Sequence, residues 1–345
     1  MAAAGAAGQR LRITNGCPTE TLWIAHEAGA SIGPDPQNVR IDPLQSHDFT
    51  TSDGLMATRY WGKMGCDALG NNCVLGGSGG PGQSCVHPGG DYSRCAPPID
   101  TKFEASFGRS GQPCDPAANM MQGCDYIDVS LVDGFTLPFR LELSGQCTGK
   151  GVNGPHVMDC SSMSFAVCPG AEVLTALGAT VSLKAVNPAT GEVAGCYSPC
   201  SKLIDDKWGN TFGHGRKVQD PGVAPYCCPT PPESPEACRA GPIKDTAYVQ
   251  AVHNGCPGVY GYSYDDEMGL LRCSTATQYN MIFYCPASPL KRAAKASPPW
   301  HLLFGVALAL GAALLLYSQR GRLLGYEHSA LPMSQMQVPG HPNLY

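Results

Sequence analysis

Cysteine dominates the reactive side chains of this chain. Eighteen of its 345 residues are cysteines, and all of them lie within residues 17–285. An even count, wide scatter and no dense Cys/His cluster favour disulfide bonds over a metal site. Zinc binding needs closely spaced Cys-x-x-Cys pairs, which neither Cys196-x-x-x-Cys200 nor the adjacent Cys227-Cys228 supplies. We therefore expect an oxidising compartment, disulfides throughout and no bound metal.

Other chemistries find little support in the sequence. The nine histidines are scattered and form no His-Glu-x-x-His set. The Gly-rich segment that begins at Gly76 lacks the Lys-Ser/Thr pair of a phosphate loop. A formal net charge of −5 does not favour binding to nucleic acid, which is itself negatively charged. We expect no cofactor and no nucleic-acid partner.

Short apolar runs between turn residues predict the elements that position the remaining polar side chains. Turn-rich sequence with short β-like runs is typical of a mainly β domain, either a sandwich or a barrel with long disulfide-tied loops. The one short helix that we predict covers residues 246–253. The predicted strands are residues 11–13, 21–25, 127–132, 135–143, 180–185 and 280–284.

The chain changes character after its last cysteine. Residues 287–299 read as a stalk, and residues 300–317 (WHLLFGVALALGAALLLY) contain no Asp, Glu, Lys or Arg. A helix of that length rises about 27 Å, which is enough to cross the hydrocarbon core of a bilayer. We predict a single-pass transmembrane helix there, although a buried core helix is the alternative. The cysteines then place residues 11–286 on the extracellular or lumenal side, with a cytosolic, disordered tail at 318–345 whose protein partner is unknown.

The N-terminal residues 1–10 contain no recognisable signal peptide, because Arg10 closely follows a short, weakly apolar stretch. Either the true start lies upstream, which is the reading we prefer, or the C-terminal span directs insertion into the membrane.

Residues 11–286 resemble the thaumatin-like, or osmotin-like, family. Several segments carry the resemblance in the family's order, so chance does not explain the agreement. These segments are residues 13–18 (ITNGCP), 22–25 (LWIA), 40–46 (RIDPLQS), 59–66 (RYWGKMGC), 103–107 (FEASF), 126–139 (YIDVSLVDGFTLPF), 226–228 (YCC), 256–264 (CPGVYGYSY) and 283–286 (FYCP). The resemblance implies a β-sandwich core with disulfide-rich loop domains.

The resemblance also implies a disulfide plan. The pairs carried over are Cys17–Cys285, Cys66–Cys73, Cys85–Cys95, Cys147–Cys273, Cys160–Cys256, Cys168–Cys196, Cys200–Cys227 and Cys228–Cys238. Cys114 and Cys124 remain, inside an insertion, and we expect them to pair with each other. That would make nine bonds and leave no free thiol.

An acidic cleft is the functional feature that the resemblance implies. Its residues map onto Arg59, Glu104, Asp128, Asp133 and Asp265, although Asp266 stands beside the last of these. Crowded carboxyls raise one another's pKa and a neighbouring Arg opposes this, so one acid can stay protonated while another is ionised. Glycoside hydrolysis needs such a pair. For that case we assign Glu104 as the acid and Asp128 as the base or nucleophile. The alternative is that these acids only cap turns and balance Arg59.

The sequence thus predicts a membrane-anchored, defence-related extracellular domain that binds β-1,3-glucan or another cell-wall polysaccharide through this cleft. Two alternatives remain open. One is a weak endo-β-1,3-glucanase, and the other is a protein-interaction or structural surface module without a carbohydrate ligand. Fold alone does not decide among them.

Overall fold

A computed structural model describes residues 8–29, 31–77, 99–115, 118, 120–149, 157–287 and 290. Among these residues, no helix has both the length and the apolar character needed to cross a membrane. The predicted span at 300–317, the tail at 318–345 and the Cys85–Cys95 pair lie outside the described residues, as does most of the predicted stalk.

Two large β-sheets form the core. The first sheet has the order β11-β9-β17-β1-β4, and the second has the order β10-β16-β7-β6-β5-β2-β3. The strands of the first are β1 (Leu11–Asn15), β4 (Ser46–Phe49), β9 (Phe139–Ser144), β11 (Val157–Cys160) and β17 (Gln278–Phe283). Those of the second are β2 (Leu22–Ala28), β3 (Val39–Ile41), β5 (Thr58–Met64), β6 (Lys102–Ser106), β7 (Cys124–Ser130), β10 (Cys147–Thr148) and β16 (Leu271–Ser274).

Aromatic rings join the two sheets face to face. Phe103 of β6 lies 6.1 Å, centroid to centroid, from Tyr279 of β17. Phe49 of β4 meets Tyr60 of β5 edge-on at 5.0 Å. Alternation along each strand sends these rings into the core and sends their sequence neighbours to the opposite face of the sheet. A β-sandwich is therefore the core of this mainly β fold.

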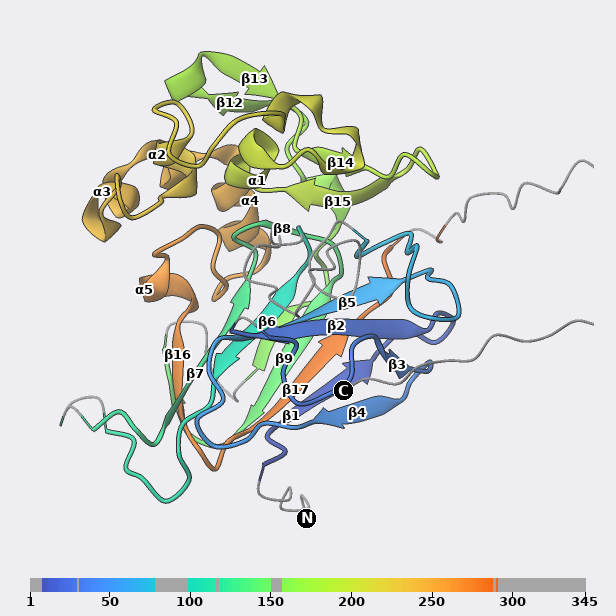
Figure 1. Cartoon of the computed structure of the whole chain (residues 1–345), viewed down its shortest axis with the longest axis vertical. Coiled ribbons are helices and arrows are strands. Elements are labelled where there is room, and N and C mark those ends of the chain that lie inside the picture. The colour runs from blue at the N-terminus through green and yellow to red at the C-terminus, as the bar shows by residue number, and fades with distance from the viewer. Residues whose placement is uncertain are drawn as a thin grey trace, which may run out of the picture. The chain divides into compact units, whose positions relative to one another are not determined.

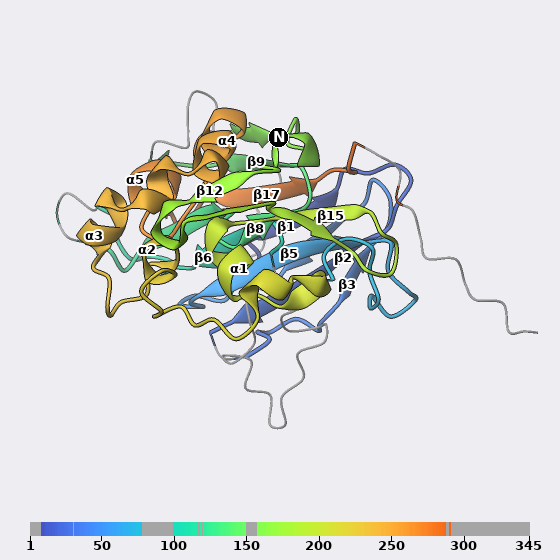
Figure 2. The same cartoon turned by 90° about the horizontal axis from the view of Figure 1, so that it is seen from above.

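Smaller elements gather above the sandwich in Figure 1, and Figure 2 shows them from above. Their strands are β8 (Gly134–Phe135), β12 (Glu172–Leu174), β13 (Ala179–Val181), β14 (Lys184–Val186) and β15 (Val193–Tyr197). Their α-helices are α1 (Pro199–Ile204), α2 (Ala224–Cys227), α3 (Pro235–Ala240), α4 (Ala247–Gly255) and α5 (Asp266–Gly269). Short 3-10 helices are η2 (Phe165–Val167), η3 (Thr175–Leu177), η4 (Lys207–Gly209), η5 (Thr211–Gly213) and η6 (Pro242–Asp245).

Local interactions explain which predicted helices and strands are present in the structure and which are not. The predicted helix is confirmed as α4, because Thr246 caps its first turn and Glu172 accepts hydrogen bonds from the backbone of Ala247 and Tyr248. The predicted strand at 135–143 is wrong as one element, since Pro138 lacks an N–H and separates β8 from β9. The strand at 180–185 is also two elements, because β13 pairs with β12 whereas β14 pairs with β15.

The first and last strands of the sandwich are joined to each other. β1 and β17, the first and last strands, pair in parallel, and Cys17–Cys285 lies just beyond them. Arg10 precedes the predicted domain boundary, yet it is buried and pairs with Asp125 at 2.5 Å. Chain entropy makes this 268-residue disulfide loop the most restrictive one in the unfolded state.

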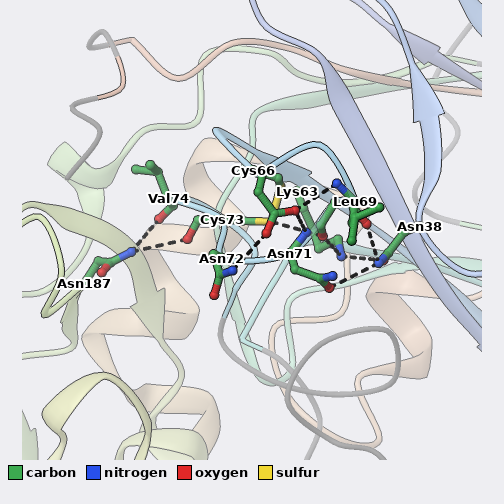
Figure 3. The surroundings of a disulfide bond; sticks show 11 residues. Asn38, Lys63, Cys66, Leu69, Asn71, Asn72, Cys73, Val74 and Asn187 are labelled. Atoms are coloured by element: carbon green, nitrogen blue, oxygen red, sulfur yellow. Dashed lines mark hydrogen bonds between the residues drawn. A yellow bond between two sulfur atoms is a disulfide. The ribbon is translucent and has the colours of Figure 1, made fainter. Parts of the chain in front are cut away.

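Among the described residues, eight disulfides are formed and no cysteine is free. They are eight of the nine pairs expected above, including Cys114–Cys124. Figure 3 shows the surroundings of Cys66–Cys73, where buried Lys63 donates to Asn38 at 2.6 Å and to the Gly70 carbonyl at 2.7 Å. Burial lowers the pKa of Lys63 to about 8. Such crosslinking is typical of a secreted-type domain.

The disulfides should differ in their contribution to stability. Replacing Cys17 and Cys285 together by Ser should lower the free energy of unfolding by about 5 kcal/mol, because the loop they close is long. Replacing Cys114 and Cys124 should cost about 2–3 kcal/mol and keep the fold, because their loop is short. Urea unfolding without reductant measures both. A greater loss from the Cys114/Cys124 variant would show that the insertion is part of the core.

Candidate acidic site

Strand register places three of the predicted residues in one row. On the second sheet, Arg59 of β5 lies opposite Glu104 of β6, and Glu104 lies opposite Asp128 of β7. Directly opposed residues have Cβ atoms about 4.5–5.5 Å apart and point to the same face. Their flanking residues Tyr60, Phe103 and Val129 point into the sandwich instead. The row therefore lies on the face of the sheet away from the sandwich core.

Arg59 is bound on both sides. Its Nε lies 2.8 Å from Oε1 of Glu104, and its Nη1 lies 2.8 Å from Oε1 of Glu27. Glu27 belongs to β2 and lies opposite Arg59, so the row has four members. Burial disfavours the charged guanidinium, but the two carboxylates outweigh it and hold the pKa of Arg59 above its ordinary value. Arg59 therefore stays a cation.

The two acids of the row differ in their surroundings. Burial raises the pKa of Glu104, while the charges of Arg59 and Lys102 oppose that rise. The pKa of Asp128 is raised further, by burial and then by repulsion from Glu104. Oδ1 of Asp128 is buried and has no hydrogen-bond partner within the described part of the chain. The pKa of Asp128 is thus raised further than the pKa of Glu104, which is ion-paired to Arg59.

This order of pKa values bears on the roles assigned for the case of hydrolysis, in which Glu104 is the acid and Asp128 the base or nucleophile. Its cause is the position of the cation, because Arg59 is ion-paired with Glu104 and forms no such pair with Asp128 among the described residues. Proximity to a cation decides which of two coupled carboxyls loses its proton first.

Asp133 and Asp265 are placed differently from each other. Oδ2 of Asp133 lies 2.9 Å from Nζ of Lys102, whose side chain is buried in the same sheet face. Asp265 is nearly buried and turns to another side, where Oδ2 accepts hydrogen bonds from the Gly261 backbone at 2.9 Å and pairs with His253 Nε2 at 2.7 Å. The structure therefore does not bring Asp265 into the row.

Asp266 takes the position expected of Asp265. Its Oδ1 accepts a hydrogen bond from the Tyr260 hydroxyl at 2.8 Å, and its charge helps to raise the pKa of Asp128. Tyr260 is fixed beside the end of β7, because its N–H donates to the Val129 carbonyl and its carbonyl accepts from Leu131. Figure 1 shows α5, which begins at Asp266, beside the ends of β16 and β7. Tyr260 and Asp266 thus form one wall of the site.

Four residues join the site beside those carried over from the family resemblance: Glu27, Lys102, Tyr260 and Asp266. Lys102 stands two residues before Glu104 in one strand, so the period of two would have placed it on the same face. Glu27 and Tyr260 join through strand pairing and a loop contact, which carry no local sequence signal.

Comparison with known proteins identifies the family of this chain. The Thaumatin family model matches residues 15–286, and the chain therefore belongs to the thaumatin family. It is 28% identical to "Thaumatin-like protein 1a" of Malus domestica, over 82% of this chain and 92% of the relative.

Two further relatives and one solved structure are also similar. "Pathogenesis-related protein 5" of Arabidopsis thaliana is 28% identical over 79% of this chain and 89% of its own length. "Glucan endo-1,3-beta-glucosidase" of Prunus avium is 29% identical over 66% and 71%. The structure of a thaumatin-like xylanase inhibitor has 16% identity and a TM-score of 0.31, with 80% of this chain and 99% of the inhibitor covered.

The electrostatics of the row predict an unusual effect on stability. The folded state binds the Asp128 proton more tightly than the unfolded state does. As the pH rises above 3.8, the ordinary pKa of aspartate, Asp128 therefore lowers the free energy of unfolding. Asp128→Asn removes this penalty. Its melting temperature at neutral pH should exceed that of the wild type by about 2–4 °C, and the gain should vanish near pH 3.

Asp48→Asn is the matched control. Asp48 is paired with Arg12 on the surface, and its pKa is lowered rather than raised. This control should show no gain at neutral pH. A melting temperature of Asp128→Asn at or below that of the control would contradict the raised pKa of Asp128.

Proposed function

We propose that the acidic row binds a cell-wall polysaccharide of the β-1,3-glucan class in a defence-related role. The observation that carries this proposal is the buried Oδ1 of Asp128, which lacks a partner within the described residues and stands beside the Arg59–Glu104 ion pair. Sugar hydroxyls both donate and accept, so they suit a neutral acid next to charged groups. The printed name of the Prunus avium relative supports the same ligand class.

The arrangement separates two kinds of contact. Glu104, which is ion-paired to Arg59, offers a charged acceptor, and hydrogen bonds from hydroxyls to charged acceptors are the stronger kind. Asp266 adds acceptor oxygens at the wall formed with Tyr260. Asp128 offers a neutral carboxyl that an amide imitates in shape. Tyr260 supplies an aromatic ring at the same wall. Asp133 belongs to the same proposed site, but its exchange for Asn would leave Lys102 buried without its counter-ion.

Substitutions of the charged acceptors and of Asp128 should affect binding to insoluble β-1,3-glucan differently. Glu104→Gln and Asp266→Asn should each weaken binding about tenfold, since a hydrogen bond to a charged group contributes roughly 1.5–3 kcal/mol. Asp128→Asn should bind almost as well as the wild type, whereas Asp128→Ala should lose about two- to tenfold. Sedimentation of the protein with the polysaccharide measures each affinity.

Asp159→Asn controls for loss of negative charge, because Asp159 is exposed on β11 of the other sheet. Unchanged binding by Glu104→Gln and Asp266→Asn together would contradict the proposal. It would favour the alternative in which the domain binds a protein or has a structural role.

A weak endo-β-1,3-glucanase remains the alternative function. Asp128 would then protonate the leaving oxygen, and Glu104 would act as the ionised partner. Their direct opposition across β6 and β7 is closer to the spacing of a retaining pair than to the wider spacing of an inverting one. Release of reducing sugar that Asp128→Asn abolishes without loss of binding would support hydrolysis. Binding without any turnover by the wild type would exclude it.

We also propose that residues 300–317 anchor this domain to a membrane, with residues 11–286 on the extracellular or lumenal side. The absence of charge over that length supports the proposal. The full chain should stay in membranes washed with carbonate, because a spanning helix is not released by high pH. Release into the wash would contradict the anchor.

A further inference from the structure

A pocket lies at the other end of β5 from the acidic site. Arg59 is near the start of β5, whereas Met64 ends it and accepts a hydrogen bond from Val74 N at 3.1 Å. Val74 lines a pocket of about 300 Å³. No residue of the acidic row lines this pocket, so the two sites are separate.

The pocket wall is apolar and is assembled from distant segments. Besides Val74, it includes Pro138 before β9, Met163 and Phe165 around η2, Val193 of β15 and Leu290. Known small-molecule sites of this kind have volumes from about 300 to 1,000 Å³ and are lined mainly by apolar side chains. The pocket is therefore large enough for a small ligand.

Neighbouring contacts hold the wall in place. The ring of Phe165 stacks on Phe135, with centroids 6.3 Å apart and planes 23° apart. Asn187 donates to the Cys73 and Val74 carbonyls, which fastens the loop that follows Cys66 to the turn between β14 and β15 (Figure 3). A pocket built from such fixed elements is preformed, so a ligand does not have to order it.

The hydroxyl of Thr136 is the polar group of interest in the pocket wall. Thr136 is 4% exposed and lines the pocket, and its backbone N–H donates to Thr101. Its Oγ1 is buried and has no hydrogen-bond partner among the described residues. Burying an unpaired hydroxyl is unfavourable, so a polar group in the pocket that bonds to Thr136 removes that cost.

The charges around the pocket restrict that group. No Lys or Arg is present among its described lining residues. An anionic headgroup would therefore find no cation among them to offset the cost of leaving water. A neutral hydroxyl or carbonyl would bond to Thr136 without that cost, because a threonine hydroxyl both donates and accepts.

We propose that this pocket is a binding site for a small neutral amphiphile, with an apolar body against Phe165 and Val193 and one hydroxyl or carbonyl hydrogen-bonded to Thr136. The site goes beyond the proposed glucan binding and does not depend on it. A lipid alcohol of medium chain length represents the ligand class.

The test uses the full chain and a photoreactive diazirine analogue of n-decanol. Saturable labelling should fall on peptides that contain residues 163–167 or 193, and n-decanol should block it better than n-decanoate or n-decane. Ala166→Trp places a large side chain at the exposed edge of the pocket and should abolish the labelling. Thr136→Val, which loses only the hydroxyl, should weaken protection by n-decanol about three- to tenfold.

Thr180→Val is the matched control, since Thr180 is exposed on β13 and does not line the pocket. It should label like the wild type, and all these variants should keep the glucan affinity of the wild type. Labelling that is unsaturable or indifferent to Ala166→Trp would overturn the site. Equal protection by n-decanoate, or an unchanged Thr136→Val variant, would overturn the proposed ligand chemistry.

Discussion

The ion pair between Arg59 and Glu104 is the interaction on which the account of the acidic site depends. It joins β5 to β6 at one register position, and Glu104 in turn faces Asp128 on β7. Because Arg59 is paired with Glu104, the two carboxyls are unequal, and the pKa of Asp128 is raised further. The charge of Lys102 also opposes the rise in the pKa of Glu104.

Contacts between the first and last strands of the sandwich hold the acidic row in place. The first and last strands pair in parallel, and Cys17–Cys285 locks their ends together. Buried Asp125 of β7 accepts hydrogen bonds from Arg10 and from the Tyr279 hydroxyl of β17, so it connects the strand that carries Asp128 to the other sheet. Such connections leave little freedom for a slip in register, which would turn every side chain of a strand to the other face.

The sequence predicted the fold class of residues 11–286 and part of the site, but not the bounds of every strand. Cysteine number and the ordered segments of the family predicted the sandwich, eight observed disulfides and the grouping of Arg59, Glu104 and Asp128. Three features depended on contacts between distant segments. Glu27 enters through pairing of β2 with β5, Tyr260 through its bonds to β7, and Asp266 rather than Asp265 because Asp265 is held by His253 and Gly261. The order of the two pKa values required the place of Arg59 relative to both acids.

The most direct test of the central claim is a pH titration of the Asp128 and Glu104 carboxyl carbons by NMR, with Asp128→Asn and Glu104→Gln used to assign the signals. The account predicts that Glu104 loses its proton first and that Asp128 keeps its own to a pH well above the ordinary range for aspartate. In Glu104→Gln, the titration of Asp128 should move to lower pH, because the repelling charge is gone. Ionisation of Asp128 at an ordinary pH, or before Glu104, would contradict the account.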